Sequence, residues 1–141
     1  MDEPRIAFEP FIDEGVRQFI VNGLDNHNIA AFSLATYFPT NFVLRAESGE
    51  VLGGLLGFIW GGWLNVTYLW VTEGERGKGH GGRLLAAAEA YAVQKGCIGS
   101  ALDTHNPAAR ALYERHGYAV IGEIADWPPG HSRTYLKKTP L

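Results

Sequence analysis

The chain has 141 residues, of which 46% are hydrophobic and 19% charged, and its formal net charge is −3 at pH 7. This length and composition are typical of a single folded domain, residues 1–141, and they exclude wholesale disorder. The acidic balance and the absence of a run of Lys and Arg argue against a nucleic-acid partner, and the net negative charge weakly favours a cationic substrate.

The N-terminal half predicts one strand and one helix, followed by three strands. A short strand is expected at residues 5–8, and a helix at 11–31, where apolar side chains recur at near-helical spacing. Residues 41–45, 51–60 and 63–72 are rich in aromatic and β-branched side chains and are separated by glycine turns, which is typical of strands. Because these turns are tight, the three strands should form an antiparallel meander.

The C-terminal half predicts two helices and three strands. A glycine-rich loop at 73–82 opens a helix that ends near Lys95. Asn106 and Pro107 predict the start of the second helix, because asparagine caps a first turn and proline has no N–H to lose there; this helix should end at Gly117. Strands are expected at 97–104, 118–125 and 132–138. The predicted order is therefore β-α-βββ-α-β-α-ββ, an α/β fold with a mixed sheet.

The cysteine content and the apolar stretches of the sequence predict the cellular compartment of the protein. Cys97 has no partner for an internal disulfide, which fits a reducing environment, and it opens an apolar run, which favours a small buried side chain over a nucleophile. The longest apolar stretch, residues 51–64, is glycine-rich and shorter than the ~20 residues of a membrane span, and the N-terminus has no apolar signal core. We expect a cytoplasmic protein with no membrane partner.

The glycine loop predicts a phosphate site. Residues 76–82 leave a strand and enter a helix, so the glycines allow close approach of the backbone to an anion, and the first free N–H groups of the helix point at it. Arg76, Lys78 and Arg83 add positive charge.

A dinucleotide fold is the main rival interpretation of this loop. Gly77, Gly79 and Gly82 satisfy the Gly-x-Gly-x-x-Gly fingerprint, and Asp103 follows about 20 residues later. We reject it because the loop follows an apparent antiparallel meander rather than the first strand of a βαβ unit, and the remaining chain is too short for the second half of such a sheet. A Walker loop is excluded because no Gly-Lys-Ser/Thr occurs.

Two motifs make the sequence resemble the GNAT superfamily of N-acetyltransferases. Arg76-x-x-Gly79-x-Gly81 is similar to the signature Gln/Arg-x-x-Gly-x-Gly/Ala. Residues 106–113, followed by Gly117 and an aromatic residue, are similar to the signature Asn-x-x-Ala-x-x-x-Tyr, then Gly-aromatic. The two motifs occur in the expected order, and the resemblance covers residues 40–138. It implies a GNAT-like acyl-CoA N-acyltransferase fold, with a mixed sheet of six to seven strands, flanking helices, and a β-bulge or splay between the fourth and fifth strands.

The resemblance also implies acetyl-CoA as cosubstrate and assigns residues to it. Backbone groups of Leu69, Trp70 and Val71 would pair with the pantetheine arm, and Asn106 would reach its amides. The residues expected around the pyrophosphate are Arg76, Gly77, Lys78, Gly79, His80, Gly81, Gly82 and Arg83. Tyr113 matches the family's proton donor to the departing thiolate, with core packing as the alternative role.

The expected reaction is direct attack of a primary amine on the thioester through a tetrahedral intermediate. An alkyl amine is mostly protonated at neutral pH, so a group must take its proton. The positions where relatives carry a glutamate base correspond to Asn65 and Ala101. Asp103 shares a strand face with Ala101 and is the expected substitute, with Glu73, His105 or a water chain as alternatives.

The acceptor is expected to be a small-molecule amine. The five histidines never fall at metal-ligand spacing and there are no paired cysteines, so no metal is expected. Two alternative functions stay open: a protein or peptide acetyltransferase acting on lysine or an N-terminus, and a non-catalytic acyl-CoA-sensing module. A homodimer is also left open, since residues 126–131 lie where relatives often border the acceptor site or a dimer contact.

Overall fold

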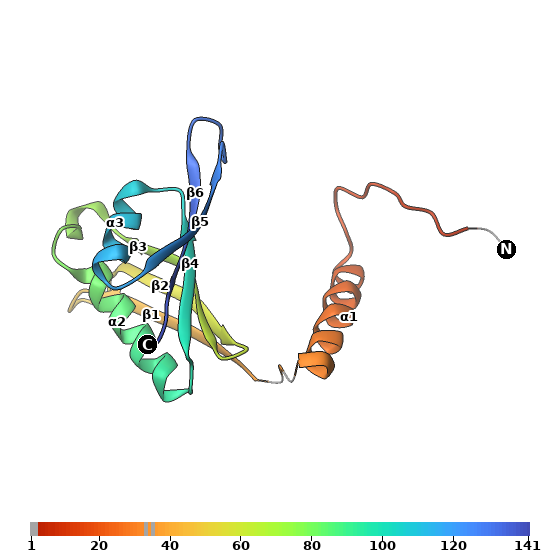
Figure 1. Cartoon of the computed structure of the whole chain (residues 1–141), viewed down its shortest axis with the longest axis horizontal. Helices are drawn as coiled ribbons and strands as arrows, with labels where there is room; N and C mark the ends of the chain where they lie inside the picture. The colour runs from red at the N-terminus through yellow and green to blue at the C-terminus, as the bar shows by residue number, and fades with distance from the viewer. Residues whose placement is uncertain (1–2, 33, 35) are drawn as a thin grey trace. The chain divides into compact units, whose positions relative to one another are not determined.

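The computed structural model describes residues 3–32, 34 and 36–141, which contacts divide into two compact units, Met1–Ala35 and Thr36–Leu141 (Figure 1). The first unit holds helix α1 (Glu14–Phe32). This helix begins later than predicted because Asp13 caps it: the Asp13 carboxylate accepts the Gly15 N–H at 2.9 Å. The strand predicted at residues 5–8 is wrong. Residues 5–8 form no strand among the described residues, because an extended segment becomes a strand only where a paired strand takes its backbone hydrogen bonds.

The second unit is built on a six-stranded sheet with the strand order β1-β2-β3-β4-β6-β5. Its strands are β1 (Tyr37–Arg45), β2 (Val51–Trp60), β3 (Trp63–Val71), β4 (Gly99–Thr104), β5 (Ala119–Ala125) and β6 (Ser132–Lys138). β1, β2 and β3 form the predicted antiparallel meander. β3 and β4 run parallel and the other pairs are antiparallel, so the sheet is mixed, as predicted.

The two central strands, β3 and β4, part after a short paired stretch. They pair at three positions only, the last of which joins Asn65 to Ala101. Near this point β3 contains one extra residue, because the register with β2 shifts beside Gly57 and leaves Thr67 without an opposite residue. Such a bulge bends a strand and increases its twist. The C-terminal ends of β3 and β4 are therefore separated, and the glycine loop begins shortly after the end of β3.

Two helices of this unit, α2 (His80–Gln94) and α3 (Pro107–Arg115), lie on the same side of the sheet (Figure 1). Their apolar faces and that of the sheet form one core, in which the largest fully buried apolar side chains are Leu55, Leu64, Leu85 and Leu136. Burying a leucine side chain contributes roughly 1.5–3 kcal/mol, so this layer of side chains fixes both helices on the sheet. Cys97 is buried in the same core, as predicted, and its burial raises the pKa of its thiol. None of the helices in the described residues is long and apolar enough to cross a membrane.

The ends of α3 follow the sequence signals. The Asn106 side-chain oxygen accepts the Ala108 N–H at 2.9 Å, and Pro107 occupies the first turn. After the helix, Gly117 has φ +92°, a left-handed conformation that residues with a side chain rarely adopt. These two signals set where the helix that carries Tyr113 begins and ends.

Candidate active site

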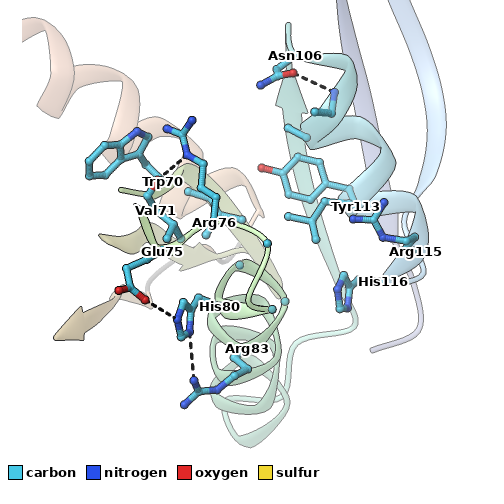
Figure 2. Close-up of a pocket in the computed structure, with 18 of the residues that line it drawn as sticks. Trp70, Val71, Glu75, Arg76, His80, Arg83, Asn106, Tyr113, Arg115 and His116 are labelled. Carbon is cyan, nitrogen blue, oxygen red and sulfur yellow. Dashed lines mark hydrogen bonds and ion pairs between the residues drawn. The ribbon is translucent and has the colours of Figure 1, made fainter. Parts of the chain in front are cut away.

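A cavity of about 860 Å³ opens between the end of β3, the glycine loop with the first turns of α2, and α3 (Figure 2). Its volume falls within the range of cofactor pockets. Eleven of the twelve residues predicted to bind the cofactor line it, which are Leu69, Trp70, Val71, Arg76, Gly77, Gly79, His80, Gly81, Gly82, Arg83 and Asn106. The cavity thus brings together two motifs that lie about 30 residues apart in the sequence. Helix α2 and strand β4 occupy the chain between them.

The first turn of α2 offers unused backbone donors to the cavity. Gly79 precedes the helix in a left-handed conformation, with φ +82°, and its carbonyl accepts the Arg83 N–H at 3.2 Å. The preceding N–H groups, those of His80, Gly81 and Gly82, have no carbonyl of the helix to bond. Together with the positive end of the helix dipole, they form a site that suits a phosphate.

The packing of α2 against α3 explains why this turn contains glycine. A Cβ atom on Gly82 would lie 2.5 Å from the His116 ring, and one on Gly81 would lie 3.1 Å from a Leu112 methyl group. A side chain at Gly82 would therefore push α3 or the His116 ring away from the loop. The glycines bring the two helices into contact at the floor of the cavity.

A chain of hydrogen bonds orients the cationic side chains of the loop. The Glu75 carboxylate pairs with His80 Nε2 at 3.2 Å, and His80 Nδ1 faces an Arg83 terminal nitrogen, also at 3.2 Å (Figure 2). Since Arg83 can only donate, His80 carries its proton on Nε2 and gives it to Glu75. The hydrogen bonds from Lys78 and His80 hold the pKa of Glu75 below its usual value.

Lys78 does not line the cavity. Its ammonium group is exposed and pairs with Glu75 at 3.2 Å. Its role in holding phosphates therefore stays a prediction that the geometry does not support.

Arg76 is bound to the end of β3. Its Nε donates to the Val71 carbonyl at 2.9 Å (Figure 2). This carbonyl belongs to the stretch expected to pair with the pantetheine arm. Arg76 thereby holds the loop to the strand, while its terminal nitrogens make no hydrogen bond with the described part of the chain.

Tyr113 is 6% exposed, yet its hydroxyl points into the cavity and makes no hydrogen bond within the described residues (Figure 2). Burial, with a smaller contribution from the negative charge of Asp103, raises the pKa of this phenol. Its ring lies 5.9 Å from that of Tyr118, whose own hydroxyl is bound to Ser100 at 2.8 Å. Of these two tyrosines, only Tyr113 offers a free, protonated O–H group to a ligand.

Asp103 does not line this cavity but lies beside it, on the part of β4 that has separated from β3. Arg133 Nε donates to one of its carboxylate oxygens at 2.6 Å, and this bond raises the pKa of the Arg133 guanidinium. The guanidinium carbon lies 4.4 Å from the centre of the Trp127 ring and 5.2 Å from that of Tyr135. His105, one of the alternative bases, lies edge-on to Trp127 at 6.4 Å. The second alternative, Glu73, is exposed in a short 3₁₀ turn, Glu73–Glu75.

The sequence interpretation missed three charged or titratable residues of this region. Arg115 and His116 line the cavity from the last turn of α3, and Arg133 reaches Asp103 from β6. Helical spacing from Ala108 and Leu112, which also line the cavity, could have placed Arg115 on the same face. The Arg133 contact spans 30 residues of sequence and carries no local signal.

This combination of a splayed mixed sheet, a phosphate-binding loop and a tyrosine hydroxyl in one cavity defines an acyl-CoA-dependent acyltransferase. The sequence matches the Acetyltransferase (GNAT) family over residues 7–118. The chain belongs to the GNAT family and is an acyl-CoA-dependent N-acetyltransferase.

The similar proteins include curated enzymes and solved structures. The chain is 38% identical over 126 residues to Acetyltransferase Atu2258 of Agrobacterium fabrum, covering 89% of this chain and 92% of that protein. It is 46% identical over 93 residues to the Blasticidin-S acetyltransferase of Streptomyces morookaense, covering 65% of this chain and 68% of that protein. A crystal structure assigned as an acetyltransferase from Agrobacterium tumefaciens superposes with a TM-score of 0.91 at 35% identity, covering 96% of this chain and 99% of that one.

Proposed function

We propose that the protein transfers an acetyl group from acetyl-CoA to a primary amine on a small molecule, by direct attack of the amine on the thioester. The observation that carries this proposal is the cavity itself, in which the free N–H groups of α2 and the unpaired Tyr113 hydroxyl face the same space. The donors suit a diphosphate, and the parting of β3 from β4 after Asn65 supports the family's placement of an extended arm between these strands. When bound, acetyl-CoA supplies an activated acyl carbon and a thiolate leaving group.

Tyr113 is the proposed proton donor. Its O–H is protonated at neutral pH, as an ordinary phenol is, and burial raises its pKa further, so it can donate a hydrogen bond to the sulfur and pass a proton to the departing thiolate. Backbone groups of Leu69 and Val71 at the end of β3 are proposed to orient the thioester, as the family resemblance implies. Val71 has its carbonyl engaged by Arg76, which supports a fixed geometry at this end of the strand.

Asp103 is the proposed acceptor of the amine proton. One of its oxygens is held by Arg133, while the other makes no hydrogen bond with any described residue. A carboxylate held in one orientation beside the opened strands can receive a proton from an incoming ammonium group. Arg133 acts here as a positioning residue, and its guanidinium group contacts the rings of Trp127 and Tyr135.

A small-molecule acceptor is supported by one relative and by the chemistry around Asp103. The Blasticidin-S acetyltransferase of Streptomyces morookaense is named for a small-molecule substrate. In this chain, the rings of Trp127 and His105 lie near the pair formed by Asp103 and Arg133, beside the separated end of β4. Such a combination of rings and charges suits a compact amine. A cytoplasmic location and a single domain over residues 1–141 stay predictions of the sequence.

An amine panel tests this function. Acetyl-CoA is incubated with the protein and either a pool of small primary amines or a pool of lysine-containing peptides, and free thiol is measured against a no-acceptor control. We expect thiol release above the control with small amines and little with peptides. Release with peptides alone would favour a protein acetyltransferase. Release with neither pool, in a protein that binds acetyl-CoA, would favour the acyl-CoA-sensing module.

A further inference from the structure

The cationic groups around the cavity are not equally engaged with the rest of the protein. Arg76 is bonded to the Val71 carbonyl, and one terminal nitrogen of Arg83 is bonded to His80. Arg115 lines the cavity and makes no hydrogen bond, ion pair or ring contact with any described residue. The other arginine of α3, Arg110, is bonded to Glu114 at 2.8 Å and to Glu123 at 2.6 Å.

Arg115 belongs to a different helix from the donors of the diphosphate site. The free N–H groups that suit a diphosphate belong to the first turn of α2, residues 80–82, where Arg83 follows directly. Arg115 lies on a different helix, at the C-terminal end of α3. Its neighbour His116 packs on Gly82 and lines the same cavity, so Arg115 lies where the C-terminal end of α3 borders the cavity.

A ligand with one diphosphate group would leave Arg115 without an anion. Coenzyme A carries a second, separate anionic group, the 3′-phosphate of its ribose, which bears about −1.5 to −2 charges near neutral pH like other phosphomonoesters. An exposed guanidinium has five donors and pairs well with such a group.

We propose that Arg115, with His116 beside it, forms a subsite for the 3′-phosphate of coenzyme A and makes the protein select this cofactor over its 3′-dephosphorylated form. The inference rests on the proposed function, because it takes acetyl-CoA to be the cosubstrate. It assigns Arg115 to specificity and leaves Arg83 and the glycine loop to the diphosphate.

Calorimetric titration with coenzyme A and with 3′-dephospho-coenzyme A tests the proposal without any turnover. The wild type should bind coenzyme A about fivefold to tenfold more tightly than 3′-dephospho-coenzyme A. An exposed ion pair with charged hydrogen bonds changes an affinity by about this factor. Arg115→Met should lower the affinity for coenzyme A by the same factor and leave that for the dephosphorylated form unchanged. Arg115→Lys should keep part of the preference, and the wild-type preference should shrink as salt is raised.

Arg110→Met is the matched control. Arg110 lies on the same helix, but its charge is bound by two glutamates, so this variant should keep the wild-type ratio of affinities. Equal affinities of the wild type for both compounds would overturn the subsite. Equal weakening of both compounds by Arg115→Met would overturn it too, because Arg115 would then hold the diphosphate. If the wild type binds neither compound, the proposed function fails together with the subsite.

Discussion

Tyr113 presents a protonated hydroxyl to the cavity without a partner in the described residues, and Tyr113→Phe removes that hydroxyl while keeping the buried ring. We expect kcat to fall about tenfold to a hundredfold, at or below the low end for general acids, because a thiol with a pKa near 8.5 leaves tolerably unaided. The dissociation constant of coenzyme A and the melting temperature should barely change. This pattern marks an interaction made mainly in the transition state.

The rates of the wild type and of Tyr113→Phe are compared where the chemical step limits turnover. Single-turnover kinetics with a saturating acceptor meet this condition. A variant that turns over at the wild-type rate would leave Tyr113 with a packing role only.

Asp103→Asn tests the proposed proton acceptor. We expect kcat/KM to fall about tenfold to a hundredfold near pH 7 and to recover in part toward pH 10, where an alkyl amine is increasingly unprotonated. The measurement is the pH profile of kcat/KM. Glu73→Gln is the matched control, since Glu73 is an exposed carboxylate on the same unit and should leave the profile unchanged. A wild-type profile for Asp103→Asn would assign the proton to water, and a shifted profile for Glu73→Gln would assign it to Glu73.

At the scale of single residues, the sequence predicted most of the cavity but not its electrostatics. The motifs that predict the cofactor site are local in sequence, and eleven of the twelve residues assigned to the cofactor line one cavity. Lys78 differs because Glu75, three residues earlier, binds its ammonium group. The pairing of Asp103 with Arg133 depends on β4 and β6 being neighbours in the sheet, which no local pattern encodes.

At the scale of elements, the contact of α2 with α3 places the phosphate-binding turn. Gly82→Ala puts a Cβ atom 2.5 Å from the His116 ring and should lower the free energy of unfolding by about 1–3 kcal/mol, as overpacking does. In a His116→Ala background the same change should cost much less, because the clashing ring is gone. Urea denaturation of the four proteins in this cycle measures both costs. Additive costs would mean that His116 does not set the packing of this turn.

Helices and strands whose ends carry turn or cap residues were predicted with bounds close to the observed ones. β2 and β6 have the bounds expected from their turns, and α3 begins at its asparagine cap. The strand expected at residues 5–8 failed because pattern alone cannot supply a pairing partner. The splay of β3 from β4 was expected from the family resemblance, while its local cause, the unpaired Thr67, depends on a register shift that sequence does not reveal.

At the scale of the whole molecule, the cavity between the glycine loop and α3 is the proposed place where an acetyl group passes from coenzyme A to an amine. The most direct test follows the acetyl group itself. The protein is incubated with acetyl-labelled acetyl-CoA and a pool of small primary amines, and free thiol and labelled N-acetyl product are quantified together by mass spectrometry. We expect thiol and N-acetyl amine in equal amounts, and neither of them when the acceptor is omitted. Thiol released without labelled amine, or no thiol at all from a protein that binds acetyl-CoA, would mean that the cavity does not carry out acetyl transfer to a small amine.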